Sequence, residues 1–127
     1  MFTKIINGEI PSHKVYEDDK TLAFLDIRPI TPGMTLVVTK SQVANFEDLE
    51  DEDYQALWST VRKVALKLRK TFPDAHKIGV QVEGFEVPHV HVKVLPLFFI
   101  EDFKKEAEDP SEPDHTSLAA MAERLKI

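Results

Sequence analysis

The sequence predicts an α+β fold in which a five-stranded, mainly antiparallel sheet is combined with one long helix and a short C-terminal helix. Two observations support this prediction. Short β-rich runs are bounded by turn residues, and one long segment between them carries apolar residues at three- and four-residue steps. The chain has 127 residues, of which 43% are hydrophobic, so residues 1–127 are expected to form a single domain.

Three strands are expected in the first half of the chain. Residues 14–17 and 21–26 flank the polar sequence EDDK, which suits a tight turn between antiparallel strands. A turn-rich connection with two prolines and Gly33 follows. The β-rich run at residues 34–38 then supplies the third strand.

The long helix is expected at residues 48–72. Acidic residues gather at its start and basic residues towards its end, as the helix dipole favours, and Pro73 marks its end. The acidic residues could instead bind a cation, but a dipole-matched helix start explains them better, so no metal is expected there. The apolar positions at helical spacing are Leu49, Leu57, Val61, Val64, Ala65 and Leu68.

Two more strands are expected after the helix, at residues 76–82 and 87–95, around Glu83-Gly84-Phe85. A polar segment from about residue 101 leads into a short helix in the sequence SLAAMAERLKI, before which Asp114 and Thr116 are both suitable N-caps. The whole of residues 101–127 is therefore expected to be a polar segment followed by a helix.

The composition excludes several classes of function. The chain has no cysteine, which rules out disulfides, thiol nucleophiles and cysteine-ligated zinc. Its net charge of −6 disfavours broad binding to nucleic acid. No apolar run is long enough to span a membrane and the start lacks the pattern of a signal peptide, so a cytoplasmic protein without membrane partners is expected.

The sequence EVPHVHVKVLPL carries the candidate chemistry. In a strand, residues two apart share a face, so His89, His91 and Lys93 would project together while the intervening valines project towards the core. An ammonium beside two imidazoles suits an anion such as phosphate better than a metal ion. Zinc would need further ligands from distant residues, to which nothing in the sequence points.

A simpler interpretation is that these residues form the wet face of an edge strand, which an isolated H-x-H pair often does. The other three histidines, His13, His76 and His115, stand alone in turn or terminal contexts and are assigned no role.

The chain resembles the histidine triad (HIT) superfamily, and within it the HINT-like branch. The family signature has three histidines separated by single apolar residues, and PHVHVKVLP matches it except that Lys93 takes the place of the third histidine. The segments FTKIINGEIPSHKVYEDD and LAFLDIRPITPGMTLVV are similar to the N-terminal half of that family.

This resemblance implies a function. HIT proteins usually pair into homodimers and hydrolyse or transfer nucleotides at the α-phosphate, so a homodimer is expected here, and no cofactor is expected. By position His91 matches the nucleophile that forms a covalent nucleotidyl-histidine, and His89 matches the histidine that orients it. The expected substrate is a purine nucleotide or a nucleotidyl compound: a nucleoside phosphoramidate, a dinucleoside polyphosphate or a related ester.

The resemblance also implies a nucleotide-binding wall. Asp26 and Ile27 match positions that bind the ribose and base, and three apolar residues resemble the surface around the base: Phe24, Phe2 and Ile5. For Phe2 and Ile5, ordinary core packing explains the residue type equally well.

Three departures from the family lie at the phosphate end. Lys93 supplies charge but is a poor proton shuttle, Met34 stands where many members have a further histidine, and the compact loop at residues 83–88 places Glu86 near the expected anion. These departures leave open an alternative in which the protein keeps the fold and binds nucleotides with little or no catalysis.

Overall fold

The computed structural model describes residues 2–104 and 112–127. Part of the polar segment expected after residue 101 therefore lies outside the described residues. The helices, including two short 3-10 helices labelled η, and the strands are α1 (Phe2–Ile6), β1 (Lys14–Glu17), β2 (Thr21–Leu25), β3 (Thr35–Thr39), η1 (Phe46–Asp48), α2 (Asp51–Thr71), β4 (Lys77–Gln81), β5 (His91–Leu97), η2 (Ile100–Lys104) and α3 (His115–Leu125).

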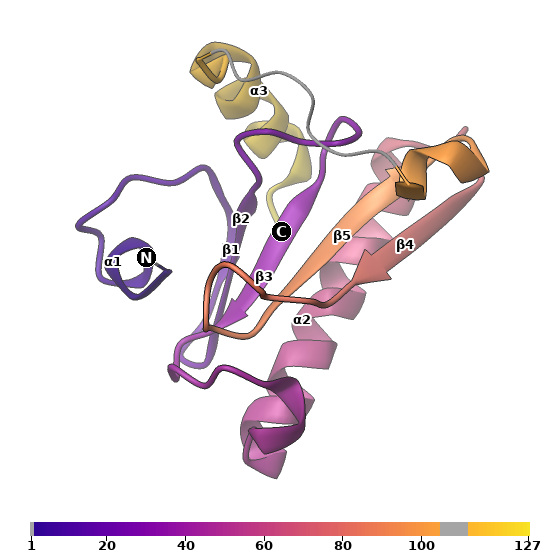
Figure 1. Cartoon of the computed structure of the whole chain (residues 1–127). Coiled ribbons are helices and arrows are strands. Elements are labelled where there is room, and N and C mark those ends of the chain that lie inside the picture. Colours follow the sequence, from indigo (N-terminus) through magenta and orange to yellow (C-terminus); the bar gives the residue numbers. More distant parts are fainter. Residues whose placement is uncertain (1, 105–111) are drawn as a thin grey trace.

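The five strands form one antiparallel sheet in the order β1-β2-β3-β5-β4. Strands β1 to β3 follow one another as neighbours, as short antiparallel connections allow, and β5 returns between β3 and β4. The predicted α+β class with a five-stranded antiparallel sheet is confirmed (Figure 1).

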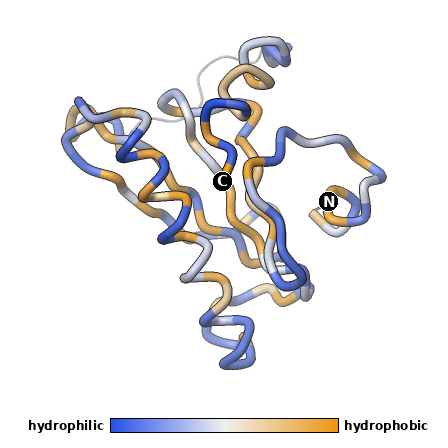
Figure 2. Tube along the Cα trace, turned by 180° about the vertical axis from the view of Figure 1, so that it is seen from behind, coloured by the Kyte–Doolittle hydropathy of each residue, from blue (hydrophilic) through white to orange (hydrophobic). Residues whose placement is uncertain are grey.

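Helix α2 covers one face of the sheet. Its apolar stripe packs against the strands through buried Leu57, Val64 and Leu68, together with Val92 and Val94 of β5. Figure 2 shows the corresponding pattern, because the tube of α2 alternates between hydrophilic and hydrophobic residues while the inner strands are largely hydrophobic. The amphipathic period thus directs one side of this helix to the core.

The opposite face of the sheet carries a second, smaller apolar cluster. Phe2 and Ile5 of α1 pack there on four strand residues: Leu22, Phe24, Leu36 and Val38. Helix α1 was not predicted from the sequence. The helix has only five residues, fewer than an isolated helix needs to be stable, so its packing on the sheet decides its conformation.

The element boundaries differ from the prediction at several places. Helix α2 begins at Asp51 rather than at residue 48, because the short helix η1 precedes it. Strand β5 begins at His91 rather than at residue 87, and it continues through Pro96, beyond the last pairing with β3 at Val94. Proline is tolerated at that point because β5 pairs there only with β4.

The C-terminal helix begins two residues earlier than predicted. Helix α3 starts at His115, and the side chain of Asp114 accepts a hydrogen bond from the backbone N–H of Ser117. Asp114 is therefore the N-cap, and Thr116 lies inside the helix. None of the helices in the described part of the chain is long and apolar enough to span a membrane.

Candidate functional site

The site lies on the face of the sheet away from α2. The register pairs His91 with Val38 and Lys93 with both Leu36 and Gln81. The valines that alternate with these residues are buried in the α2 core, as the alternation in the sequence predicts. The sheet therefore presents His91 and Lys93 on its second face.

His89 lies just before β5, in the connection from β4, and not in the strand as predicted. Its ring nevertheless packs on the same residue as that of His91, because both rings make T-shaped contacts with the ring of Phe2. The centroid distances from Phe2 are 5.7 Å to His89 and 4.9 Å to His91. The two histidines are only 2% and 6% exposed, so the interpretation as a wet strand face is wrong for them.

Two hydrogen bonds fix the rings of these histidines. Nδ1 of His91 lies 2.8 Å from the backbone oxygen of His89, and Nε2 of His89 lies 2.6 Å from the backbone oxygen of Thr39. A carbonyl oxygen can only accept, so both ring nitrogens donate. In the neutral form of His91 the lone pair is then on Nε2, which is the arrangement required for attack on an electrophile.

Burial keeps His89 neutral. It lowers the pKa of the imidazole, and the electrostatic interaction with the neighbouring His91 acts in the same direction, while the hydrogen bond to Thr39 opposes them. Nδ1 of His89 is buried without a hydrogen-bond partner in the described part of the chain. An unpartnered ring nitrogen is tolerated more easily as a neutral acceptor than as part of a charged ring.

This pKa shift predicts a loss of stability in mild acid. The folded pKa of His89 is lower than the unfolded value of about 6.5, so the unfolded state binds more protons and the stabilising contribution is lost as pH falls below that value. We expect the free energy of unfolding to fall between about pH 7 and pH 5, and to fall less in His89→Gln, which cannot titrate but can still donate to Thr39. Urea unfolding at several pH values measures the difference; parallel pH profiles would contradict the assignment.

Asp26 follows the last residue of β2. Its backbone N–H donates to the oxygen of Met34, and its carboxylate accepts from the backbone N–H of Arg28 at 2.9 Å. Burial raises the pKa of the Asp26 carboxyl, and the Arg28 N–H and the charge of Lys93 oppose this effect. The carboxylate thus lies in a shielded position where it can accept from ligand hydroxyls.

Lys93 forms an ion pair with Glu83, which was not predicted as a site residue from the sequence. Its Nζ lies 3.5 Å from Oε1 of Glu83, and both side chains are about one quarter to one third exposed, 26% and 30%. The backbone N–H groups of Gly84 and Phe85 lower the pKa of the Glu83 carboxyl, which therefore stays ionised.

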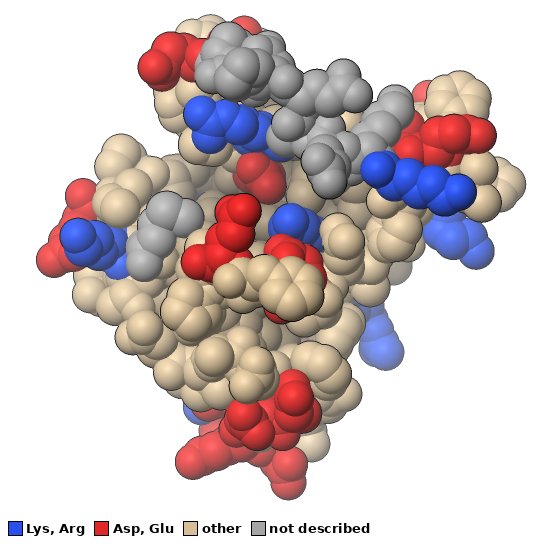
Figure 3. All heavy atoms as spheres, in the orientation of Figure 1, with Lys and Arg blue, Asp and Glu red and all other residues tan. Residues whose placement is uncertain are grey.

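Two cavities that are lined by described residues meet this group. The larger has a volume of about 520 Å³ and is lined by Asp26, Arg28, Ile30, Met34, Gln81, Glu83, Phe85, Glu86, Lys93, Phe103 and Lys104. The smaller, of about 130 Å³, is lined by Ala44, Asn45, Phe46, Glu47, Val82, Glu83, Gly84, His89, Val90 and His91. Figure 3 shows acidic and basic side chains gathered around a hollow on this face.

The structure therefore divides the predicted site residues into groups. Asp26 and Lys93 line the larger cavity, whereas His89 and His91 line the smaller one. The three apolar residues expected around a base, Phe2, Ile5 and Phe24, form the buried cluster beside the histidines and line neither cavity. Ile27 is 41% exposed and also lines neither.

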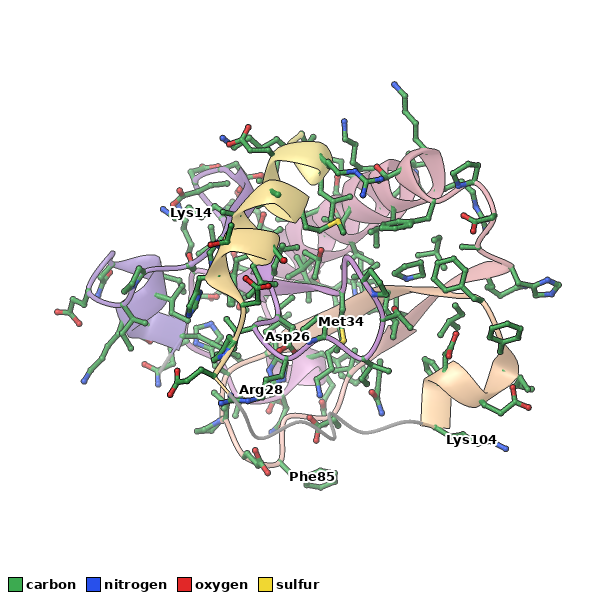
Figure 4. The ribbon with its side chains drawn as sticks, turned by 90° about the horizontal axis from the view of Figure 1, so that it is seen from above. Lys14, Asp26, Arg28, Met34, Phe85 and Lys104 are labelled. Atoms are coloured by element: carbon green, nitrogen blue, oxygen red, sulfur yellow. The ribbon has the colours of Figure 1, made fainter. Side chains whose placement is uncertain are left out.

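Several residues that line the larger cavity were not predicted from the sequence, among them Arg28, Phe85 and Lys104. In Figure 4, Asp26, Arg28 and Met34 lie close together, while Phe85 and Lys104 lie further out on the loop and on η2. Arg28 follows the segment LDI directly, and this is the one signal that could have indicated it. Lys104 had no such signal because only the fold brings η2 to the cavity.

Gly84 positions the loop beside His91. Its φ angle of +77° is unfavourable for other residues, and an added Cβ would lie 3.7 Å from Cε1 of His91. We expect both Gly84→Ala and Gly8→Ala to lower the free energy of unfolding by about 1–2 kcal/mol, because Gly8 has a similar φ of +81°. Only Gly84→Ala should shift the NMR signals of the His91 ring, since Gly8 has nothing within 4 Å of an added Cβ. Equal shifts in both variants would contradict this placement.

The described residues contain no group of three or more histidine, cysteine, aspartate or glutamate side chains arranged to hold a metal ion. The structure does bring together two histidines that appeared isolated in the sequence. Nε2 of His13 lies 2.8 Å from Nδ1 of His115 on α3, and the rings are stacked. This pair joins α3 to the segment before β1.

Comparison with known proteins agrees with this fold. The HIT domain family matches residues 7–100, so the chain belongs to the HIT domain family. An uncharacterised HIT-like protein of Methanocaldococcus jannaschii is 42% identical over 101 residues, which cover 77% of this chain and 78% of that protein.

A crystal structure and an enzyme extend the comparison. The structure of a HIT-like protein from Bartonella henselae, described as involved in cell-cycle regulation, superposes with a TM-score of 0.84 at 32% identity and covers 98% of this chain and 91% of that one. The asymmetrical bis(5'-nucleosyl)-tetraphosphatase of Schizosaccharomyces pombe is 35% identical over 91 residues, covering 68% of this chain and 50% of that enzyme. The family thus includes a nucleotide hydrolase.

Proposed function

We propose that this protein is a nucleotide hydrolase or nucleotidyl transferase that acts at the α-phosphate of a purine nucleotidyl compound. Its nucleophile is His91. The observation that carries the proposal is the hydrogen bond from Nδ1 of His91 to the backbone oxygen of His89, which directs the reactive lone pair to Nε2.

The proposed reaction has two steps. Nε2 of His91 attacks the α-phosphorus and the bond to the leaving group breaks; the leaving group departs already protonated, as an amine can, or takes a proton from solvent. Water then attacks the phosphorus of the nucleotidyl-histidine and gives up a proton to solvent, the P–N bond breaks, and the nucleoside monophosphate and the neutral ring are released. Covalent catalysis of this kind divides one difficult displacement into two easier ones.

The other residues bind and orient the substrate in this proposal. The Asp26 carboxylate accepts from the ribose hydroxyls, and the Lys93 ammonium binds phosphate oxygens as a positive charge rather than a proton shuttle. His89 acts as a positioning residue through its anchored backbone. The base packs against the wall formed by Phe2, Ile5, Phe24 and Ile27, after local rearrangement of the buried cluster.

The test uses a fluorogenic adenosine phosphoramidate and diadenosine tetraphosphate as substrates, with calorimetry of AMP binding. Turnover of either substrate together with AMP binding supports the proposal. Absence of both turnover and AMP binding would overturn it.

The second candidate is a nucleotide-binding protein with little or no catalysis. One observation favours this candidate: Lys93 forms an ion pair with Glu83. Because Lys93 occupies the position of the third histidine, this pairing makes its ammonium less available to a substrate phosphate. AMP binding without turnover of either substrate would favour this candidate.

For both candidates we propose a cytoplasmic homodimer that binds neither nucleic acid nor membranes, and light scattering in solution tests the dimer.

A further inference from the structure

The side chain of Glu83 stands between the two parts of the site. It lines the larger cavity with Asp26 and Lys93, and it also lines the smaller cavity with His89 and His91. A nucleotide whose ribose contacts Asp26 and whose α-phosphate reaches His91 has to extend from one cavity into the other. Glu83 therefore lies where the phosphate of such a nucleotide would pass from the larger cavity to the smaller one.

The charge of Glu83 makes this position important. Oε1 pairs with the Lys93 ammonium at 3.5 Å, and Oε2 accepts from the backbone N–H of Phe85 at 3.3 Å. The low pKa of the Glu83 carboxyl keeps it ionised at neutral pH. The carboxylate of Glu83 thus pairs with the same Lys93 ammonium that would bind a substrate phosphate.

The same segment also contacts the apolar cluster that the proposed function assigns to the base. Val87 packs against the cluster that contains Phe2, Ile5 and Phe24. Figure 1 shows the connection between β4 and β5 extending from the end of β4 towards β1 and β3 before it turns back into β5. One short segment therefore places a carboxylate at the phosphate end and an apolar side chain at the base end.

We infer that Glu83 is a gate residue that sets the affinity of the site for phosphate-bearing ligands. In the free protein its carboxylate neutralises Lys93, and a nucleotide phosphate displaces it. The inference rests on the proposed nucleotide site. Partly exposed ion pairs of this kind are weak, and a phosphate carries more charge and more acceptor oxygens than a carboxylate, so the exchange favours the nucleotide.

The test compares AMP binding to the wild type and to Glu83→Gln by calorimetry at low ionic strength. We expect Glu83→Gln to bind AMP about five-fold more tightly, because removing the competitor releases Lys93. Adenosine, which has no phosphate, should bind both proteins with the same dissociation constant in direct calorimetric titrations. Glu86→Gln is the matched comparison, since Glu86 lines the same cavity without an ion pair to any described residue, and its effect on AMP binding should stay below about two-fold.

Three results would overturn the inference: unchanged or weaker AMP binding by Glu83→Gln, an equal gain for adenosine, or an equal gain from Glu86→Gln. A wild type that binds AMP without turning over substrate would refute the catalytic proposal and leave the gate intact. If neither the wild type nor Glu83→Gln binds AMP, the nucleotide site and the gate both fail.

Discussion

Replacing His91 by alanine is expected to lower turnover of an adenosine phosphoramidate by at least about 10⁴-fold, because the substitution removes the proposed nucleophile. His91 lines the smaller cavity, and a hydrogen bond from its Nδ1 to the backbone oxygen of His89 orients its ring. Steady-state fluorescence measures the loss. Rapid quenching followed by mass spectrometry should detect a nucleotidyl adduct on the wild type and none on His91→Ala.

Two controls separate loss of chemistry from loss of structure. His91 packs against Phe2, so His91→Gln, which fills more of the space, should be equally inactive while keeping the circular dichroism spectrum of the wild type. His13→Ala should retain turnover, because His13 contacts His115 and lines neither cavity of the site. Equal turnover by the wild type and His91→Ala would contradict the covalent mechanism.

Replacing Leu57 by alanine is expected to lower the free energy of unfolding by about 2–5 kcal/mol. Leu57 is completely buried between α2 and the sheet, where the truncated side chain leaves a cavity that the packed strands cannot fill. Urea unfolding followed by circular dichroism gives the value.

The matched control lies on the same helix. Leu66 is 63% exposed, so Leu66→Ala should change the free energy of unfolding by less than about 0.5 kcal/mol. Both substitutions replace leucine by alanine within α2, so helix propensity changes equally and the difference reports burial. Similar losses for the two variants would show that α2 does not pack as described.

The sequence was most informative where a periodic pattern coincides with burial. The helical spacing of Leu57, Val64 and Leu68 predicted the face of α2 that packs on the sheet, and the alternation in β5 predicted that its valines are buried. Helix α1 and the start of β5 could not be predicted, since both depend on contacts with residues distant in the sequence. Phe2 belongs to a helix because it packs on Phe24, and no local pattern reports that contact.

The sequence selected candidate residues for the site but did not predict how they are connected. The motif and its resemblance to HIT proteins selected His89, His91 and Lys93, and the fold places them on one side of the sheet. The pairing of Lys93 with Glu83 depends on how the short connection from β4 folds back, which sequence spacing does not determine. The burial of His89 depends likewise on Phe2 and Thr39, which lie far from it in the chain.

The hydrogen bond from His91 to residue 89 has a consequence for variation in this motif. The acceptor is the main-chain oxygen of residue 89, which every amino acid possesses, while the imidazole of His89 acts one step away by donating to Thr39. The orientation of the reactive ring is thus encoded in the path of the backbone. In the proposed mechanism, position 91 therefore requires an imidazole, whereas position 89 should accept any residue that can donate to the same strand and fill the same space.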